Sequence, residues 1–260
     1  MFCLASYYLY QIYTEEEDLA EAEKYKSYVL KNHPDSRYAA GIINPGKAID
    51  MEDTAENSYK RLYALFEAGE FEQVLQLGKN FAEQFNDDDL LPKIELLTAT
   101  ATGRLYGFEA YKKQLNEVAL NYPQTEEGKK AQDLLTTALP RLESDKFNFS
   151  GKPASVKLLY SFPASQKDVA LQLKQKIDSA ITSLNYKNYS TSLDVYNIDT
   201  TFVAVHGLEN PERAGGFAEL LQVNKSYEIE KEPVVISTEN YRVLQLHKNF
   251  QAYLEQQNNP

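Results

Sequence analysis

A helix–turn–helix unit of about 34 residues opens the chain, and it limits the possible folds more than any other feature. Aromatic and apolar residues recur at helical spacing over residues 4–13, and Thr14 and Glu17 then form a capping box. We therefore expect a second helix from Thr14 to about Asn32, ended by Pro34. Because no N-cap precedes residue 4, we also expect the chain to be a fragment of a longer protein.

The unit recurs along the first half of the chain, and its positions resemble those of tetratricopeptide repeats. The first copy holds Leu9, Tyr13, Leu19, Ala22, Val29 and Pro34. The second holds Leu62, Leu65, Gly69, Phe71, Val74 and Phe81, and a more degenerate third holds Ala99, Gly107, Phe108, Tyr111, Val118 and Tyr122. A spacer at residues 42–46 separates the first two copies, and a helix over residues 125–142 closes the series. We expect a tetratricopeptide-like helical solenoid over residues 1–146.

Most of the repeated apolar residues are expected to be core, buried where one helix pair stacks on the next. A solenoid leaves the inner face of its first helices for function. Counting from the inter-helix turn places six residues on this concave face: Tyr7, Gln11, Tyr59, Tyr63, Phe66 and Arg104. Tyr and Arg are enriched at the centres of protein interfaces, so we predict partner binding there. The alternative is that several of these side chains simply pack.

The hydrophobic period changes after residues 147–154, where Gly and Pro interrupt the pattern. Strand patterns alternate with two helical ones, and the strands cover residues 156–162, 193–196, 201–205 and 234–236. This β-α-β-β-α-β order predicts a ferredoxin-like module over residues 153–260, an antiparallel sheet with both helices on one face. We expect the last strand to be central, with Val235 and Ile236 on opposite sides. An extra C-terminal helix over residues 238–256 is expected to cover the second face of the sheet.

The charge of the chain limits its partners. A net charge of −11 repels phosphate backbones and anionic lipid headgroups, so we expect no nucleic-acid partner. Residues 1–150 carry most of the excess, with 26 acidic and 16 basic side chains against 12 and 11 in residues 151–260. No run of about 18 apolar residues is present, so we expect no membrane-spanning helix in this chain.

Few residues are arranged for catalysis or metal binding. Cys3 is the only cysteine and the three histidines are far apart, so we expect no metal site and no cofactor. We interpret His206 as a hydrogen-bonded strand-end residue, because we find no Ser or carboxylate in register with it. Gly215-Gly216 is interpreted as a point of close helix packing, and the acidic run at residues 87–89 as an exposed helix start. The sequence therefore predicts a protein that is not an enzyme.

Seven stretches carry a resemblance to one family. In the helical half they are "YKSYVLKNHPDS" (25–36), "INP" (43–45), "YALFEAGEFEQV" (63–74), "LLPKIELLTATATGR" (90–104) and "LNYPQTEEGKKAQDLL" (120–135). In the module they are "FVAVHGLENPERA" (202–214) and "PVVISTENYRVL" (233–244). In this order they resemble the C-terminal part of the PorW/SprE family, and the resemblance covers nearly the whole chain.

The resemblance implies an outer-membrane lipoprotein of Bacteroidota that faces the periplasm. Such a protein belongs to the type IX secretion system and, in gliding species, to the motility machinery. It implies a scaffold that links periplasmic ring components to the outer-membrane translocon, and it brings no catalytic residues to transfer. The module also resembles peptidoglycan-binding SPOR domains in topology, which leaves a peptidoglycan tether as the second function. A peptidoglycan reader needs an open sheet face, so a terminal helix across that face would favour the scaffold.

Overall fold

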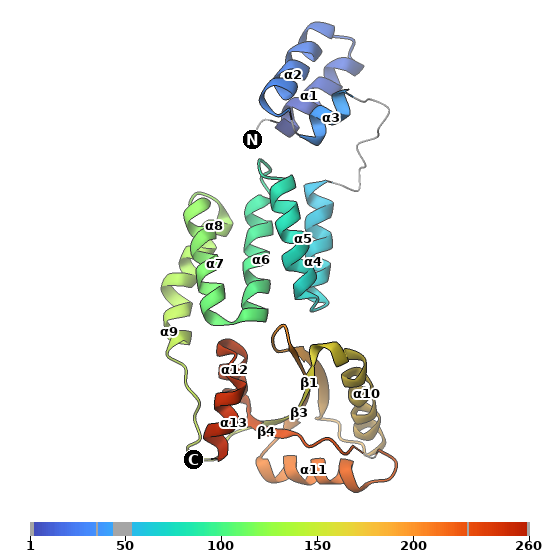
Figure 1. The fold of residues 1–260 in the computed structure, drawn as a ribbon, viewed down its shortest axis with the longest axis vertical. Helices are drawn as coiled ribbons and strands as arrows, with labels where there is room; N and C mark the ends of the chain where they lie inside the picture. Colours follow the sequence, from blue (N-terminus) through green and yellow to red (C-terminus); the bar gives the residue numbers. More distant parts are fainter. Residues whose placement is uncertain (1–2, 35, 44–53, 228, 259–260) are drawn as a thin grey trace. The chain divides into compact units, whose positions relative to one another are not determined.

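The computed structural model describes residues 3–34, 36–43, 54–227 and 229–258 (Figure 1). The chain divides into two compact units: the first holds residues 1–98 and 118–129, and the second holds residues 99–117 and 130–260. A region of paired helices is followed by a four-stranded antiparallel sheet with helices. The expected class, α plus α/β, is therefore confirmed.

Three helices begin the first unit: α1 (Cys3–Glu15), α2 (Leu19–Asn32) and α3 (Arg37–Ile43). Their buried core consists of Cys3, Val29, Ala39 and Ile42. The predicted start of the second helix at Thr14 is wrong, because the Thr14 hydroxyl donates to the carbonyl of Tyr10 inside α1, at 2.6 Å. Asp18 is the N-cap instead and accepts from the amide of Glu21 at 3.2 Å. An Asp followed by Glu three residues later is a second capping box, and α2 begins at this one.

Further helices continue the pairing: α4 (Ala55–Glu67), α5 (Phe71–Gln84), α6 (Leu91–Tyr106) and α7 (Phe108–Asn121). The expected spacer at residues 42–46 lies mostly outside the described residues. Between α4 and α5, Gly69 adopts a φ of 75°, the left-handed conformation that favours glycine at a helix end. Leu62 of α4 and Val74 of α5 are fully buried residues of this helix pair, each 0% exposed.

The helix expected over residues 125–142 forms in three pieces: α8 (Glu126–Asp133), a π-helical turn (Leu134–Ala138) and α9 (Leu139–Glu143). Thr125 caps its start by accepting from the amide of Gly128 at 3.1 Å. Pro140 explains the π turn, because proline has no amide hydrogen and its ring displaces the carbonyl one turn earlier. The amide of Leu139 accordingly donates to Leu134, five residues back.

The second unit contains one sheet with the strand order β2-β3-β1-β4 and antiparallel pairing throughout. Its strands are β1 (Val156–Pro163), β2 (Ser190–Val195), β3 (Thr200–Leu208) and β4 (Val234–Ser237). All four strands were expected, and the β2–β3 hairpin turns at residues 197–199 as expected. The prediction that the last strand is central is wrong, because β4 pairs only with β1 and lies at an edge. Four residues preceded by Pro233 suit an edge strand, since proline cannot donate to a neighbouring strand.

Helices cover both faces of this sheet (Figure 1). One face packs on α10 (Lys167–Ser183) and α11 (Pro211–Val223). The other packs on α12 (Thr238–His247) and α13 (Phe250–Asn258). The single terminal helix that we expected is thus two helices. Lys248 separates them with a left-handed backbone, φ 54° and ψ 39°, so its amide caps α12 by donating to Leu244.

Gly215 and Gly216 lie in α11 and do not mark close packing. A Cβ atom added at either position would meet no atom within 4 Å. The interpretation from the sequence is therefore wrong, and both glycines face open space on the exposed side of α11.

Candidate functional site

The sequence-predicted binding residues of α1 form one small aromatic group in the first unit. Gln11 donates from its side-chain amide to the Tyr7 hydroxyl at 3.0 Å. The Tyr7 ring also lies 5.2 Å from the ring of Tyr38, and burial raises the pKa of the Tyr7 phenol. Tyr7 is thus partly used in packing α1 against α3, whereas Gln11 is exposed.

A second group lies on α4. The rings of Tyr59 and Tyr63 are 6.4 Å apart, and Tyr63 is 47% exposed. Phe66 packs edge-on against Phe71, with ring centroids 5.3 Å apart, so it belongs to the α4–α5 contact. Tyr63 is consequently the aromatic residue of this group that is best placed to meet a partner.

Arg104 belongs to neither group. It is exposed in the last turn of α6, in the part of the chain assigned to the second unit. The structure therefore brings Tyr7 together with Gln11, and Tyr59 together with Tyr63. Arg104 lies near Tyr111, since its charge lowers the pKa of that phenol against the larger opposite effect of burial.

A covered sheet face is the main feature of the second unit. Its buried strand residues are Leu159, Phe202, Ala204 and Ile236, and the helices cover them with Tyr241, Leu244 and Tyr253. The Tyr253 hydroxyl donates to the carbonyl of Val235 at 3.1 Å, which ties α13 to the edge strand. No apolar strand residue of this group is more than 1% exposed.

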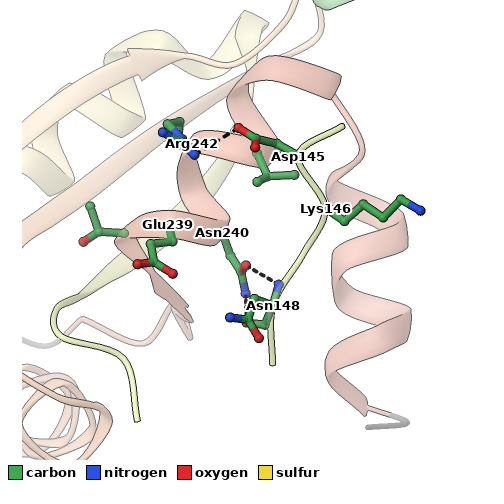
Figure 2. A pocket seen from close by; sticks show the side chains of 8 residues that line it. Asp145, Lys146, Asn148, Glu239, Asn240 and Arg242 are labelled. Carbon is green, nitrogen blue, oxygen red and sulfur yellow. Dashed lines mark hydrogen bonds and ion pairs between the residues drawn. The ribbon is translucent and has the colours of Figure 1, made fainter. Parts of the chain in front are cut away.

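The segment before β1 is bound to α12 by specific contacts (Figure 2). The buried side chain of Asn240 accepts from the backbone amide of Asn148 at 2.8 Å and donates to its carbonyl at 2.9 Å. Arg242 pairs with Asp145 at 2.9 Å. The adjoining pocket of about 380 Å³ has both signs of charge, with Asp145 and Glu239 beside Lys146 and Arg242. These charges compensate one another, and the contacts hold the segment in place.

One polar cluster on the covered face was not foreseen. Lys157 Nζ lies 2.7 Å from His206 Nδ1, and Ser192 Oγ lies 2.6 Å from His206 Nε2. Beside them the Tyr241 hydroxyl donates to Asp194, and Gln245 donates to the same hydroxyl at 2.7 Å. The expectation that no Ser is in register with His206 is therefore wrong: Ser190 pairs directly with His206 across the β2–β3 ladder, and Ser192 is its diagonal neighbour.

The geometry of this cluster opposes its use as a nucleophile and base. Burial lowers the pKa of His206, and the charge of Lys157 lowers it further. A protonated Lys157 only donates, so His206 Nδ1 must accept and Nε2 must carry the hydrogen. Nε2 then donates to Ser192 and cannot take a proton from it. The cluster satisfies the buried polar groups of three strands and α12.

Within the described ranges, His, Cys, Asp and Glu side chains do not gather in threes to hold a metal ion. In the part of the chain that the structure describes, no helix combines the length and apolarity needed to span a bilayer. Comparison with protein-family models and with curated proteins gave no match.

Proposed function

We propose that this chain is a non-enzymatic scaffold that acts by binding other proteins. The observation that carries the proposal is the covered sheet face: α12 and α13 occupy the surface that a peptidoglycan reader would have to present. The helical region supports it too, since exposed Gln11 and Tyr63 remain available beside an excess of acidic side chains.

The finer fold follows from the same elements. We infer that the helix pairs are a tetratricopeptide-like solenoid, supported by Leu62 and Val74 buried at matching positions of one pair. We infer that the second unit is a ferredoxin-like module. Its support is the strand order β2-β3-β1-β4 combined with two helices on one face.

The setting of the scaffold is proposed from the resemblance to the PorW/SprE family. The chain would lie at the periplasmic face of the outer membrane in Bacteroidota. There it would link ring components of the type IX secretion and gliding machinery to the outer-membrane translocon. The alternative is a SPOR-like peptidoglycan tether, and the covered face argues against it.

Capture from an envelope extract of a gliding Bacteroidota species tests the proposal. The immobilised full chain should retain ring or translocon proteins, and Tyr63→Ala should reduce this retention. Tyr106→Ala is the matched control, because Tyr106 is 50% exposed and Tyr63 is 47% exposed, and Tyr106 is outside the proposed face. Retention that is equal for both variants would refute the role of α4. Sedimentation of the chain with purified sacculi, without retained machinery proteins, would favour the tether.

Charge should contribute to this binding. Residues 1–150 hold 26 acidic against 16 basic side chains, so a partner with a basic surface is attracted at long range. Raising the salt to about 0.5 M shortens the Debye length to a few Å and should weaken retention. Retention that does not change with salt would show that shape alone mediates binding.

A further inference from the structure

A pocket of about 440 Å³ in the second unit is lined by cations and apolar groups. Its lining side chains from α6, α7 and α9 include Arg104, Phe108, Tyr111 and Leu142. Those from α12 and its C-terminal end are Arg242, Gln245, Leu246 and Lys248. We call this the basic pocket, because three of its lining residues are basic and none is acidic.

Two of the three cations have no paired carboxylate in the described part of the chain. Arg242 pairs with Asp145 at 2.9 Å. Among the residues that the structure describes, no carboxylate forms an ion pair with Arg104 or Lys248. Lys248 Nζ instead donates to Gln245 at 3.2 Å and lies 5.1 Å from the ring centroid of Tyr196. Two neighbouring basic side chains that have no paired carboxylate among the described residues form an arrangement that an anion would stabilise, and a bound carboxylate would favour the protonated form of Lys248.

The two cations are held close together by the backbone. Gly107, at the turn between α6 and α7, has a φ of 86°. A Cβ atom at this position would lie 2.8 Å from Lys248 Cγ and 3.1 Å from the carbonyl oxygen of Leu246. The turn therefore packs directly on the end of α12. Burial lowers the pKa of Lys248 to about 7, and the positive charge of Arg104 contributes to the shift.

The remaining lining selects the kind of anion. Phe108, Leu142 and Leu246 are apolar, and Phe108 is only 3% exposed. Such a lining disfavours a strongly hydrated dianion such as phosphate and suits an anionic group carried on an apolar body. The planar guanidinium of Arg104 matches a carboxylate in two parallel hydrogen bonds. Sites for small ligands occupy about 300–1,000 Å³, a range that includes this pocket.

We propose that the basic pocket binds a carboxylate on an apolar body, with Arg104 and Lys248 at the carboxylate and Phe108, Leu142 and Leu246 against the apolar part. The carboxylate can come from the C-terminus of a peptide or from a free organic acid. The proposal rests on the pocket alone and does not depend on the scaffold function.

Stabilisation of helix C-termini is a simpler role for the two cations, and it must be distinguished from ligand binding. Arg104 is in the last turn of α6 and Lys248 follows the last turn of α12, and cations at helix C-termini stabilise helices by about 0.3–1 kcal/mol. That role predicts a small loss of stability on substitution and no ligand. The experiment therefore measures both binding and melting temperature.

Fluorescence anisotropy of the full chain tests the proposal with a labelled peptide, Gly-Gly-Leu-Phe, in two forms. The peptide with a free C-terminal carboxylate should bind, and the same peptide with a C-terminal amide should bind at least about 10-fold more weakly. Arg104→Gln should weaken the acid form about 10-fold or more. Lys113→Gln is the matched control: it removes one positive charge from an exposed position of α7 outside the pocket, and it should leave binding unchanged.

Competition identifies the source of the carboxylate. Displacement of the peptide by 3-phenylpropionate shows that a free acid suffices; a lack of displacement, with the acid form still preferred over the amide, assigns the pocket to a peptide terminus. Either result supports the proposal. Equal binding of the acid and amide forms, undiminished binding to Arg104→Gln, or displacement by inorganic phosphate at equal concentration would overturn it. Because Arg104 is exposed, its variant is expected to fold, and a wild-type melting curve checks this.

Discussion

Leu244→Ala tests whether α12 packs on the sheet and covers its second face. Leu244 is 0% exposed and packs in the cluster that contains Leu159, Phe202 and Ile236. The substitution removes three carbon atoms, worth about 0.8 kcal/mol each in transfer free energy. A cavity adds to this loss where the surroundings do not collapse, and buried Leu→Ala changes cost about 2–5 kcal/mol. We therefore expect a loss of about 3–4 kcal/mol in the free energy of unfolding.

The matched control is Leu171→Ala, the same chemical change at a 42% exposed position of α10. It should cost at most about 1 kcal/mol, because most exposed substitutions change stability little. Urea denaturation followed by circular dichroism and tyrosine fluorescence measures both variants, since the chain has no tryptophan. If Leu244→Ala were no more destabilising than Leu171→Ala, α12 would not pack on the sheet in solution. The face would then be open, and the peptidoglycan alternative would gain support.

Five further substitutions test the packing and electrostatics of the two units. Val74→Ala should cost about 1.5–3 kcal/mol in urea denaturation, because Val74 is 0% exposed. Phe71→Ala should also destabilise, because it removes a partly buried ring that packs on Phe66; wild-type stability of both variants would mean a wrong repeat register. Gly215→Ala and Gly216→Ala should each raise stability by about 0.5–1 kcal/mol, because an added Cβ meets nothing within 4 Å; a lower melting temperature would refute this. The pKa of Lys248 is about 7 in the folded protein, against an ordinary value of 10.5. Between these pH values the unfolded chain binds more protons than the folded one, so the free energy of unfolding of the wild type should rise with pH from about 7 to 10.5. Lys248→Met, with Arg104, Tyr111, Tyr196 and His247 unchanged around it, should flatten this rise; an unaltered slope would exclude Lys248 as its source.

Local chemistry explains why most of the second unit could be predicted from the sequence. Asn210 followed by Pro211 predicts a helix start, and the Asn210 side chain accepts from the amide of Arg213 at 2.8 Å. Ser237 likewise caps α12 by accepting from the amide of Asn240 at 3.0 Å. Such signals act over three or four residues, so they can be recognised in the sequence without knowledge of the fold.

Errors arose where two local signals compete or where the outcome depends on distant residues. Thr14 and Asp18 both begin plausible capping boxes, and nothing nearby decides between them. Lys248 in a left-handed conformation has no sequence signal, since that conformation favours glycine or asparagine. It is held by packing of the α6–α7 turn, which lies more than a hundred residues away in the chain.

The same distinction between local and distant signals applies to the candidate sites. Helical spacing pairs Tyr59 with Tyr63 correctly, because one helix determines their separation. The contact of Ser192 with His206 depends on strand register, and β2 begins three residues earlier than we expected. A polar residue at every second position, at 190, 192 and 194, was the available signal, because alternate residues share one face of a strand.

The helical region carries an excess of acidic side chains whereas the basic pocket is lined by cations, and this affects what each can bind. A net charge of −11 repels a carboxylate ligand at long range, but physiological salt screens charges beyond about 8 Å. A ligand at the basic pocket therefore responds chiefly to Arg104 and Lys248, which lie in its lining. The acidic residues of the helical region act through many dispersed exposed charges, so the same rise in salt should weaken scaffold contacts more than a paired, partly buried carboxylate. Binding of a protein partner and of a carboxylate can thus be separated by salt alone, without altering a residue of either surface.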